Sequence, residues 1–192
     1  DFKMEGHVGI GHTRWATHGI PSNLNSHPHT NDVETISLVH NGIIENYREL
    51  KEELIQKGYH FQSETDSEVV VHLLDDYYDG DLFEAVKKVL KRIEGSYALC
   101  IVSTLEPNKV IVAKKDSPLI IGKADGAYVA ASDIPALLEY TKDVYFLADY
   151  EMAILQEDHI DFFTHEGEPI VKELVNVPYD LEAAKKDGYD TF

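Results

Sequence analysis

The sequence has 192 residues, of which 43% are hydrophobic, and its formal net charge at pH 7 is −18. This length and apolar content are enough for a packed core. The acidic excess makes nucleic acid and membrane surfaces poor partners. Cys100 is the only cysteine, which excludes an internal disulfide and CxxC-type zinc or redox sites. A lone thiol fits a reducing compartment, so we expect a cytoplasmic location.

The N-terminal half predicts a loop-rich opening followed by helices. The first forty residues are rich in His, Gly and Asn, which predicts one short strand and then a long ordered loop. Residues 35–40 predict a strand that runs into Asn41-Gly42. Amphipathic patterns then predict three helices. The first covers residues 46–57 (capped by Asn46 and ended by Gly58). The second runs to Tyr77 through the pattern that starts at Val69, with N-cap oxygens ahead of it at residues 63–66, and the third covers residues 82–93.

After Gly95 the pattern changes to short segments rich in β-branched and aromatic residues, separated by turn residues. A brief helix over 134–140 is the only predicted interruption. Helices followed mostly by strands predict an α+β fold with helices packed on antiparallel sheet. The predicted strands cover residues 96–103, 109–113, 118–122, 127–131, 144–148, 151–155 and 159–164.

Three short motifs contain residues suited to chemistry, and each has a structural alternative. Arg14 could bind a carboxylate through its planar guanidinium, or stack on Trp15. The Asn41 amide and the Gly42 N–H could together stabilise an oxyanion, although Asn-Gly is also a common hairpin turn. Asp66 could face a ligand ammonium or simply cap a helix.

A metal site is the alternative that the clustered histidines suggest. The sequence contains no HExxH motif, and no two histidines share a helical face. His27 and His29 form the only close pair, and in an extended segment they would point to opposite sides. Cys100 lies within an apolar strand pattern and is expected to be a buried small side chain, not a nucleophile. We therefore expect neither a metal nor a cofactor.

Four motifs taken together resemble one family. GHTRWATHG (11–19), NSHPH (25–29), VHNGIIENY (39–47) and SETDSEVV (63–70) are similar to the glutamine-hydrolysing domain of the glutamine–fructose-6-phosphate aminotransferases, the glucosamine-6-phosphate synthases. The resemblance extends over essentially the whole chain. It implies an N-terminal-nucleophile hydrolase fold, a four-layer αββα sandwich, here lacking its first strands.

The resemblance also implies L-glutamine as substrate and assigns roles to individual residues. Asn41 and Gly42 would form the oxyanion hole, and Asp66 would pair with the α-ammonium. Arg14 would bind the α-carboxylate. The resemblance places Thr17 and His18 beside Arg14 at the substrate and makes Trp15, also in this substrate-binding set, similar to the residue that gates ammonia passage to the sugar site. It gives His27 the role of ordering the loop that closes over glutamine.

The nucleophile of this family is an N-terminal cysteine, and Cys100 does not match it. We therefore expect residues 1–178 to be an N-terminally truncated glutaminase domain that is inactive alone. Residues 179–192 would begin a linker to a sugar-isomerase domain, and the parent protein would be a homodimer. Two alternatives stay open: the glutaminase domain of another class II amidotransferase such as amidophosphoribosyltransferase, and a non-catalytic glutamine-binding module.

Overall fold

The structure is a computed structural model that describes residues 6–13 and 20–178. Three helices lie in the first half of this part of the chain: α1 (Tyr47–Gln56), α2 (Glu68–Tyr77) and α3 (Leu82–Leu90). The strands are β1 (His29–Thr30), β2 (Ile36–Ile44), β3 (Gly95–Ser103), β4 (Lys109–Lys115), β5 (Ile120–Ala124), β6 (Ala127–Ala131), β7 (Asp143–Phe146), β8 (Glu151–Gln156), β9 (Ile160–Thr164), β10 (Pro169–Ile170) and β11 (Val175–Asn176).

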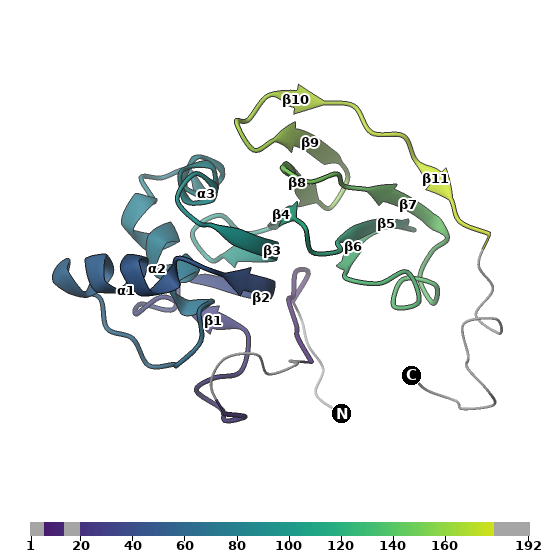
Figure 1. The fold of residues 1–192 in the computed structure, drawn as a ribbon. Helices are drawn as coiled ribbons and strands as arrows, with labels where there is room; N and C mark the ends of the chain where they lie inside the picture. The colour runs from purple at the N-terminus through teal and green to yellow at the C-terminus, as the bar shows by residue number, and fades with distance from the viewer. Residues whose placement is uncertain (1–5, 14–19, 179–192) are drawn as a thin grey trace.

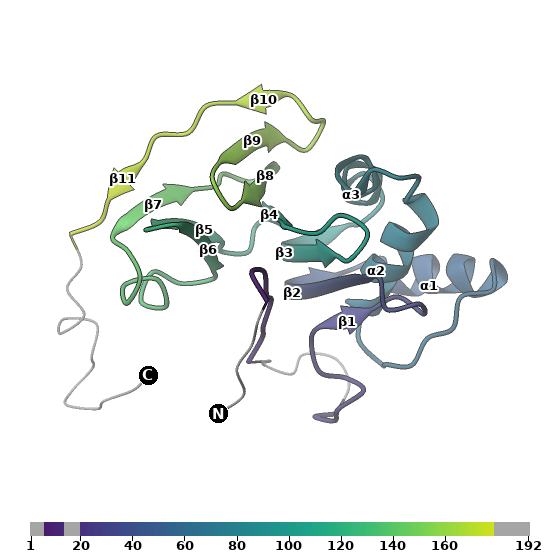
Figure 2. The same ribbon diagram turned by 180° about the vertical axis from the view of Figure 1, so that it is seen from behind.

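The strands form two antiparallel sheets. The larger has the order β1-β2-β3-β4-β8-β9-β10, and the smaller has the order β11-β7-β5-β6. The helices cover one face of the larger sheet, and the smaller sheet packs on its other face (Figures 1 and 2). The predicted α+β class with antiparallel sheets is confirmed. Helix, sheet and sheet are the three layers found within the described ranges.

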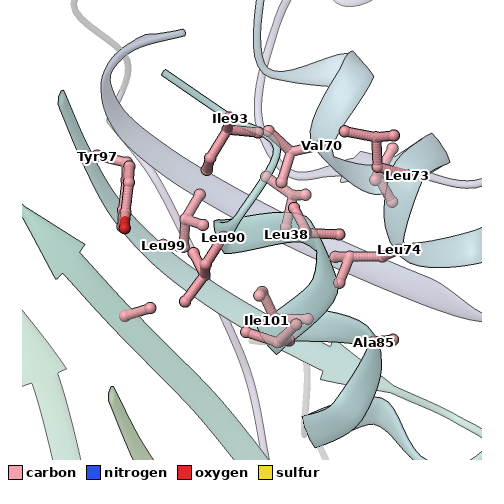
Figure 3. Packing of buried hydrophobic residues seen from close by; sticks show 14 of the residues in the cluster. Leu38, Val70, Leu73, Leu74, Ala85, Leu90, Ile93, Tyr97, Leu99 and Ile101 are labelled. Carbon is pink, nitrogen blue, oxygen red and sulfur yellow. The ribbon is translucent and has the colours of Figure 1, made fainter. Parts of the chain in front are cut away.

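The main core lies between the helices and the larger sheet. Alternate residues of β2 and β3 point toward the helices, because successive side chains of a strand face opposite sides. Leu38, Leu99 and Ile101 meet Leu73 and Leu74 of α2, and all five are fully buried (Figure 3). Each such side chain contributes about 1.5–3 kcal/mol of hydrophobic stabilisation, so this layer holds the end of β2 and the start of α2 together.

A second core joins the two sheets. Ala98 and Val112 point away from the helices and pack with Ile121 of β5. Cys100 packs against the same cluster but is only half-buried and also lines the cavity between the sheets, so the expectation of a buried side chain is met only in part. Burial raises the pKa of its thiol to about 12, so Cys100 is protonated at neutral pH and is a poor nucleophile.

Several predicted boundaries differ from the structure. The strand predicted over 35–40 continues through Asn41-Gly42 to Ile44, because its pairing with β3 does not stop there. The N-cap oxygens predicted at residues 63–66 do not cap the second helix, which begins at Glu68 with Ser67 in the N-cap position. The brief helix predicted over 134–140 is wrong: this segment is a run of turns. The predicted opening strand is also absent from residues 6–13, which form no strand.

The predicted linker over 179–192 lies outside the described residues. In the part of the chain that the structure describes, none of the helices could span a lipid bilayer.

Candidate active site

Strand β2 positions Asn41 and Gly42, and both residues lie within its ladder. Asn41 is paired with Ala98 and Gly42 with Tyr97, within a register that runs unbroken from Ile36 to Ile44. The hairpin-turn alternative for Asn41-Gly42 is therefore wrong. Both residues are half-buried, and so a ligand can reach them.

Glycine is required at position 42 by its backbone conformation and by its neighbours. Its φ is +130°, a value that side-chain-bearing residues rarely adopt. A Cβ atom placed there would lie 2.2 Å from the carbonyl oxygen of Ser96 and 3.0 Å from the hydroxyl of Ser117. The close approach of β3 thus fixes the path of the β2 backbone directly after Asn41.

The amide of Asn41 is oriented by His12. The Nε2 atom of His12 lies 2.6 Å from Oδ1 of Asn41, across 29 residues of sequence. When this nitrogen donates its proton to the amide oxygen, the NH₂ group of Asn41 points away from His12. Both residues line a cavity of about 720 Å³ between the two sheets, so the NH₂ group is available as a hydrogen-bond donor beside that cavity.

Asp66 lies immediately before α2 and is only 3% exposed. Its Oδ2 atom accepts a 2.7 Å hydrogen bond from the backbone N–H of Ile44, two residues after Gly42. The residue at the N-cap position is Ser67, and it makes no side-chain capping bond. Asp66 is thus a buried side chain bound to β2.

The histidines converge on the start of α2. His27 Nε2 lies 3.2 Å from the hydroxyl of Ser67, and His29 Nε2 lies 2.9 Å from that of Thr65. The rings of His27 and His29 are 4.7 Å apart in an edge contact, because the chain bends at His27 and is not extended there. His12 also packs on His27, with their ring centroids 4.3 Å apart.

The structure therefore brings four predicted residues, Asn41, Gly42, His27 and Asp66, to the end of β2 and the start of α2. The other four, Arg14, Trp15, Thr17 and His18, lie outside the described residues. Three further residues at this site, His12, His40 and Ser67, are not among the residues predicted from the sequence. His12 and His40 lie within motifs that were noted, but no spacing rule predicts their long-range contacts.

Buried His40 lies behind Asn41 and Gly42 on β2. Its Nδ1 atom is 2.8 Å from the Ser67 hydroxyl, and its Nε2 atom is 3.4 Å from the Ser96 carbonyl oxygen. Burial lowers the pKa of His40, although the nearby Asp66 carboxylate opposes that shift. His40 is therefore neutral at pH 7 and fills a structural position beneath the site. Within the described ranges, no group of three or more His, Cys, Asp or Glu residues is arranged to hold a metal ion.

Comparison with known proteins relates this chain to glutamine amidotransferases. A family model described as a glutamine amidotransferase domain matches residues 12–139. The glutamine–fructose-6-phosphate aminotransferase (isomerizing) of Clostridium acetobutylicum is 53% identical over 98% of this chain, and that of Aquifex aeolicus is 50% identical over 100%. The matched regions are 31% and 32% of those two proteins, so this chain spans about a third of their length.

Among solved structures, the glutamine phosphoribosylpyrophosphate amidotransferase of Bacillus subtilis superposes with a TM-score of 0.67 and 28% identity. The match covers 80% of this chain and 34% of that one. The fold is thus that of the N-terminal-nucleophile hydrolase class of amidotransferases. Within that class, the chain belongs to the glutamine amidotransferase domain family.

Proposed function

We propose that this chain is the glutamine-hydrolysing part of a glutamine–fructose-6-phosphate aminotransferase. The observation that carries the proposal is the 50–53% identity to proteins of that name over almost the entire chain. The complete protein would take nitrogen from L-glutamine and transfer it to fructose 6-phosphate, giving glutamate and glucosamine 6-phosphate. In this proposal residues 1–178 form the glutaminase domain, and residues 179–192 lead toward the sugar-isomerase part of the same protein.

The geometry at the end of β2 supports a site for glutamine. Asp66 would pair with the α-ammonium group, because it is a buried carboxylate directly beside the half-exposed end of β2. Arg14 would bind the α-carboxylate, with Trp15, Thr17 and His18 beside the substrate and His27 ordering the loop. The side-chain amide of glutamine would then face Asn41 and Gly42.

The chemical role of Asn41 and Gly42 would be to stabilise negative charge. When a thiolate attacks the glutamine amide carbon, the carbonyl oxygen becomes an oxyanion, and two N–H donors fixed at that point lower the barrier. Asn41 is suited to this because His12 engages its oxygen and leaves its NH₂ group available. Ammonia then leaves, and water hydrolyses the thioester to glutamate.

We propose that residues 1–192 do not perform this reaction alone. The sequence contains a single cysteine, and Cys100 is half-buried against the sheet-to-sheet core, where desolvation raises the pKa of its thiol to about 12. Family resemblance assigns the attacking thiolate to an N-terminal cysteine, which these residues do not include. The domain would therefore bind and orient glutamine while the full-length protein supplies the nucleophile.

A coupled assay on the full-length protein tests the proposal. Glutamine is supplied with either fructose 6-phosphate or phosphoribosyl pyrophosphate, and glutamate, glucosamine 6-phosphate and phosphoribosylamine are measured. We expect glucosamine 6-phosphate to form in step with glutamate. Product only with phosphoribosyl pyrophosphate would assign the chain to a different amidotransferase, and glutamine binding without any hydrolysis would make it a binding module.

A further inference from the structure

Ser67 is a buried residue at the start of α2 that has no role among the proposed substrate contacts. It occupies the N-cap position of α2 and is 2% exposed, yet its side chain makes no capping bond. Serine at this position normally accepts a bond from a backbone N–H of the first helical turn. Here the hydroxyl lies between two imidazoles, at 2.8 Å from Nδ1 of His40 and 3.2 Å from Nε2 of His27.

The chemistry of the partners fixes the direction of these bonds. The Ser96 carbonyl can only accept, so Nε2 of neutral His40 carries the proton and its Nδ1 is an acceptor. The Ser67 hydroxyl therefore donates to His40. Its oxygen then accepts from His27, whose Nε2 carries a proton. A single hydroxyl thus selects one tautomer for each of two histidines.

The same hydroxyl links three parts of the site. His27 belongs to the loop before β1, while His40 belongs to β2. His40 in turn contacts the Ser96 carbonyl, the atom that lies against Gly42. Asp66, the neighbour of Ser67, is bound to β2 through Ile44. The Ser67 hydroxyl therefore lies where the loop, the strand and the helix start meet.

We propose that Ser67 is a positioning residue of the glutamine site, whose hydroxyl holds His27 and His40 so that the loop, Asp66 and Gly42 keep a fixed relative placement. This inference rests on the proposed function. Without the hydroxyl, two imidazole nitrogens lose their common partner. The segment that contains the loop and β1 then loses one of its bonds to the start of α2, while Asn25 still bonds Glu64 and His29 still bonds Thr65, and we expect the cost to fall mainly on the binding of glutamine.

Three serine variants of the full-length protein test this, with KM and kcat for glutamine as the readout. Ser67→Ala is expected to raise KM at least tenfold with a smaller change in kcat, and Ser67→Thr, which keeps the hydroxyl, is expected to retain most of the wild-type KM. Ser103→Ala is the matched control, because that buried hydroxyl donates to the Thr35 carbonyl at the other end of β3. It should leave both constants unchanged.

A second variant addresses the same bond from the loop. His27→Ala should also raise KM, and the Ser67→Ala/His27→Ala double variant should raise it little beyond Ser67→Ala alone, because Ser67→Ala already breaks the bond between Ser67 and His27 along with the bond to His40. A wild-type KM in Ser67→Ala, equal losses in Ser67→Ala and Ser103→Ala, or fully additive effects would each overturn the role of Ser67. A wild-type protein with no glutaminase activity would instead overturn the proposed function itself, and the role of Ser67 with it.

Discussion

Glu68, at the first position of α2, is a buried carboxylate that accepts several hydrogen bonds, unlike the many carboxylates on the surface. It is 4% exposed and accepts hydrogen bonds from the backbone of Gln62 (2.7 Å) and from the backbone and hydroxyl of Ser63 (2.8 and 2.6 Å). Nε2 of buried His72 lies 3.6 Å away. Burial raises the pKa of Glu68, but these contacts outweigh it and lower the pKa to about 2.

This shift predicts a pH-dependent contribution to stability. Because the folded-state pKa lies below the ordinary value of 4.5, ionised Glu68 stabilises the fold by about 3 kcal/mol above that pH, and the contribution is lost as pH falls toward 2. Glu68→Gln should therefore lower the free energy of unfolding at pH 7, with a deficit that shrinks below pH 4.5. Urea unfolding between pH 7 and pH 2.5 measures this, with Glu52→Gln on the exposed face of α1 as control. A deficit that stays constant with pH would contradict it.

Among the secondary-structure elements, the site depends on the paired strands β2 and β3, whose backbones approach closely beside Asn41. Gly42 and Gly95 both have positive φ, and a Cβ atom on either would lie within 2.2 Å of a carbonyl oxygen of the opposite strand. Glycine at these two positions lets the strands approach closely at the level of Asn41. The position of the Gly42 N–H is thereby set by the sheet itself.

A comparison of two glycines tests this. Gly58 ends α1 with a φ of +97° and has nothing within 4 Å of a Cβ position. Gly58→Ala should therefore cost only the conformational strain, about 1–2 kcal/mol. Gly42→Ala adds an overlap with the Ser96 carbonyl and should cost about 4 kcal/mol or more. Thermal or urea unfolding of both variants measures the difference, and equal losses would contradict the close-approach account.

Local patterns predict which elements exist better than where they begin. Alternation predicted the central strands, and Gly58 marked the end of α1. The cap predicted for α2 is wrong because the side chains of residues 63–66 bond elsewhere. Ser63 bonds Glu68, Thr65 bonds His29, and Asp66 bonds the backbone of Ile44. These partners lie up to 36 residues away, and helix propensity contains no information about them.

Local sequence patterns also leave the roles of the site residues undecided. Asn41 and Asp66 were candidates from residue type, but each had a local structural alternative, a hairpin turn for the first and a helix cap for the second. Only the pairing of β2 with β3 removes the first alternative, and only the bond from Ile44 removes the second. The contribution of Ser67 depends on two histidines at separations of 40 and 27 residues, which no short motif encodes.

At the scale of the whole molecule, two packed cores place the site where three groups of residues meet. The helix-to-sheet core holds α2 against β2, and the sheet-to-sheet core flanks the cavity beside Asn41. The loop that precedes β1 completes the arrangement through His27. The central claim is that this meeting point binds glutamine and stabilises the oxyanion formed from it.

The most direct test is the steady-state kinetics of Asn41→Ala in the full-length protein. Loss of one oxyanion donor should lower kcat for glutamine hydrolysis by about 10²–10³ while KM changes little. Asn176→Ala, an exposed asparagine on β11 in the other sheet, is the matched control and should leave both constants unchanged. A normal kcat in Asn41→Ala, or a loss that appears only in KM, would contradict the account.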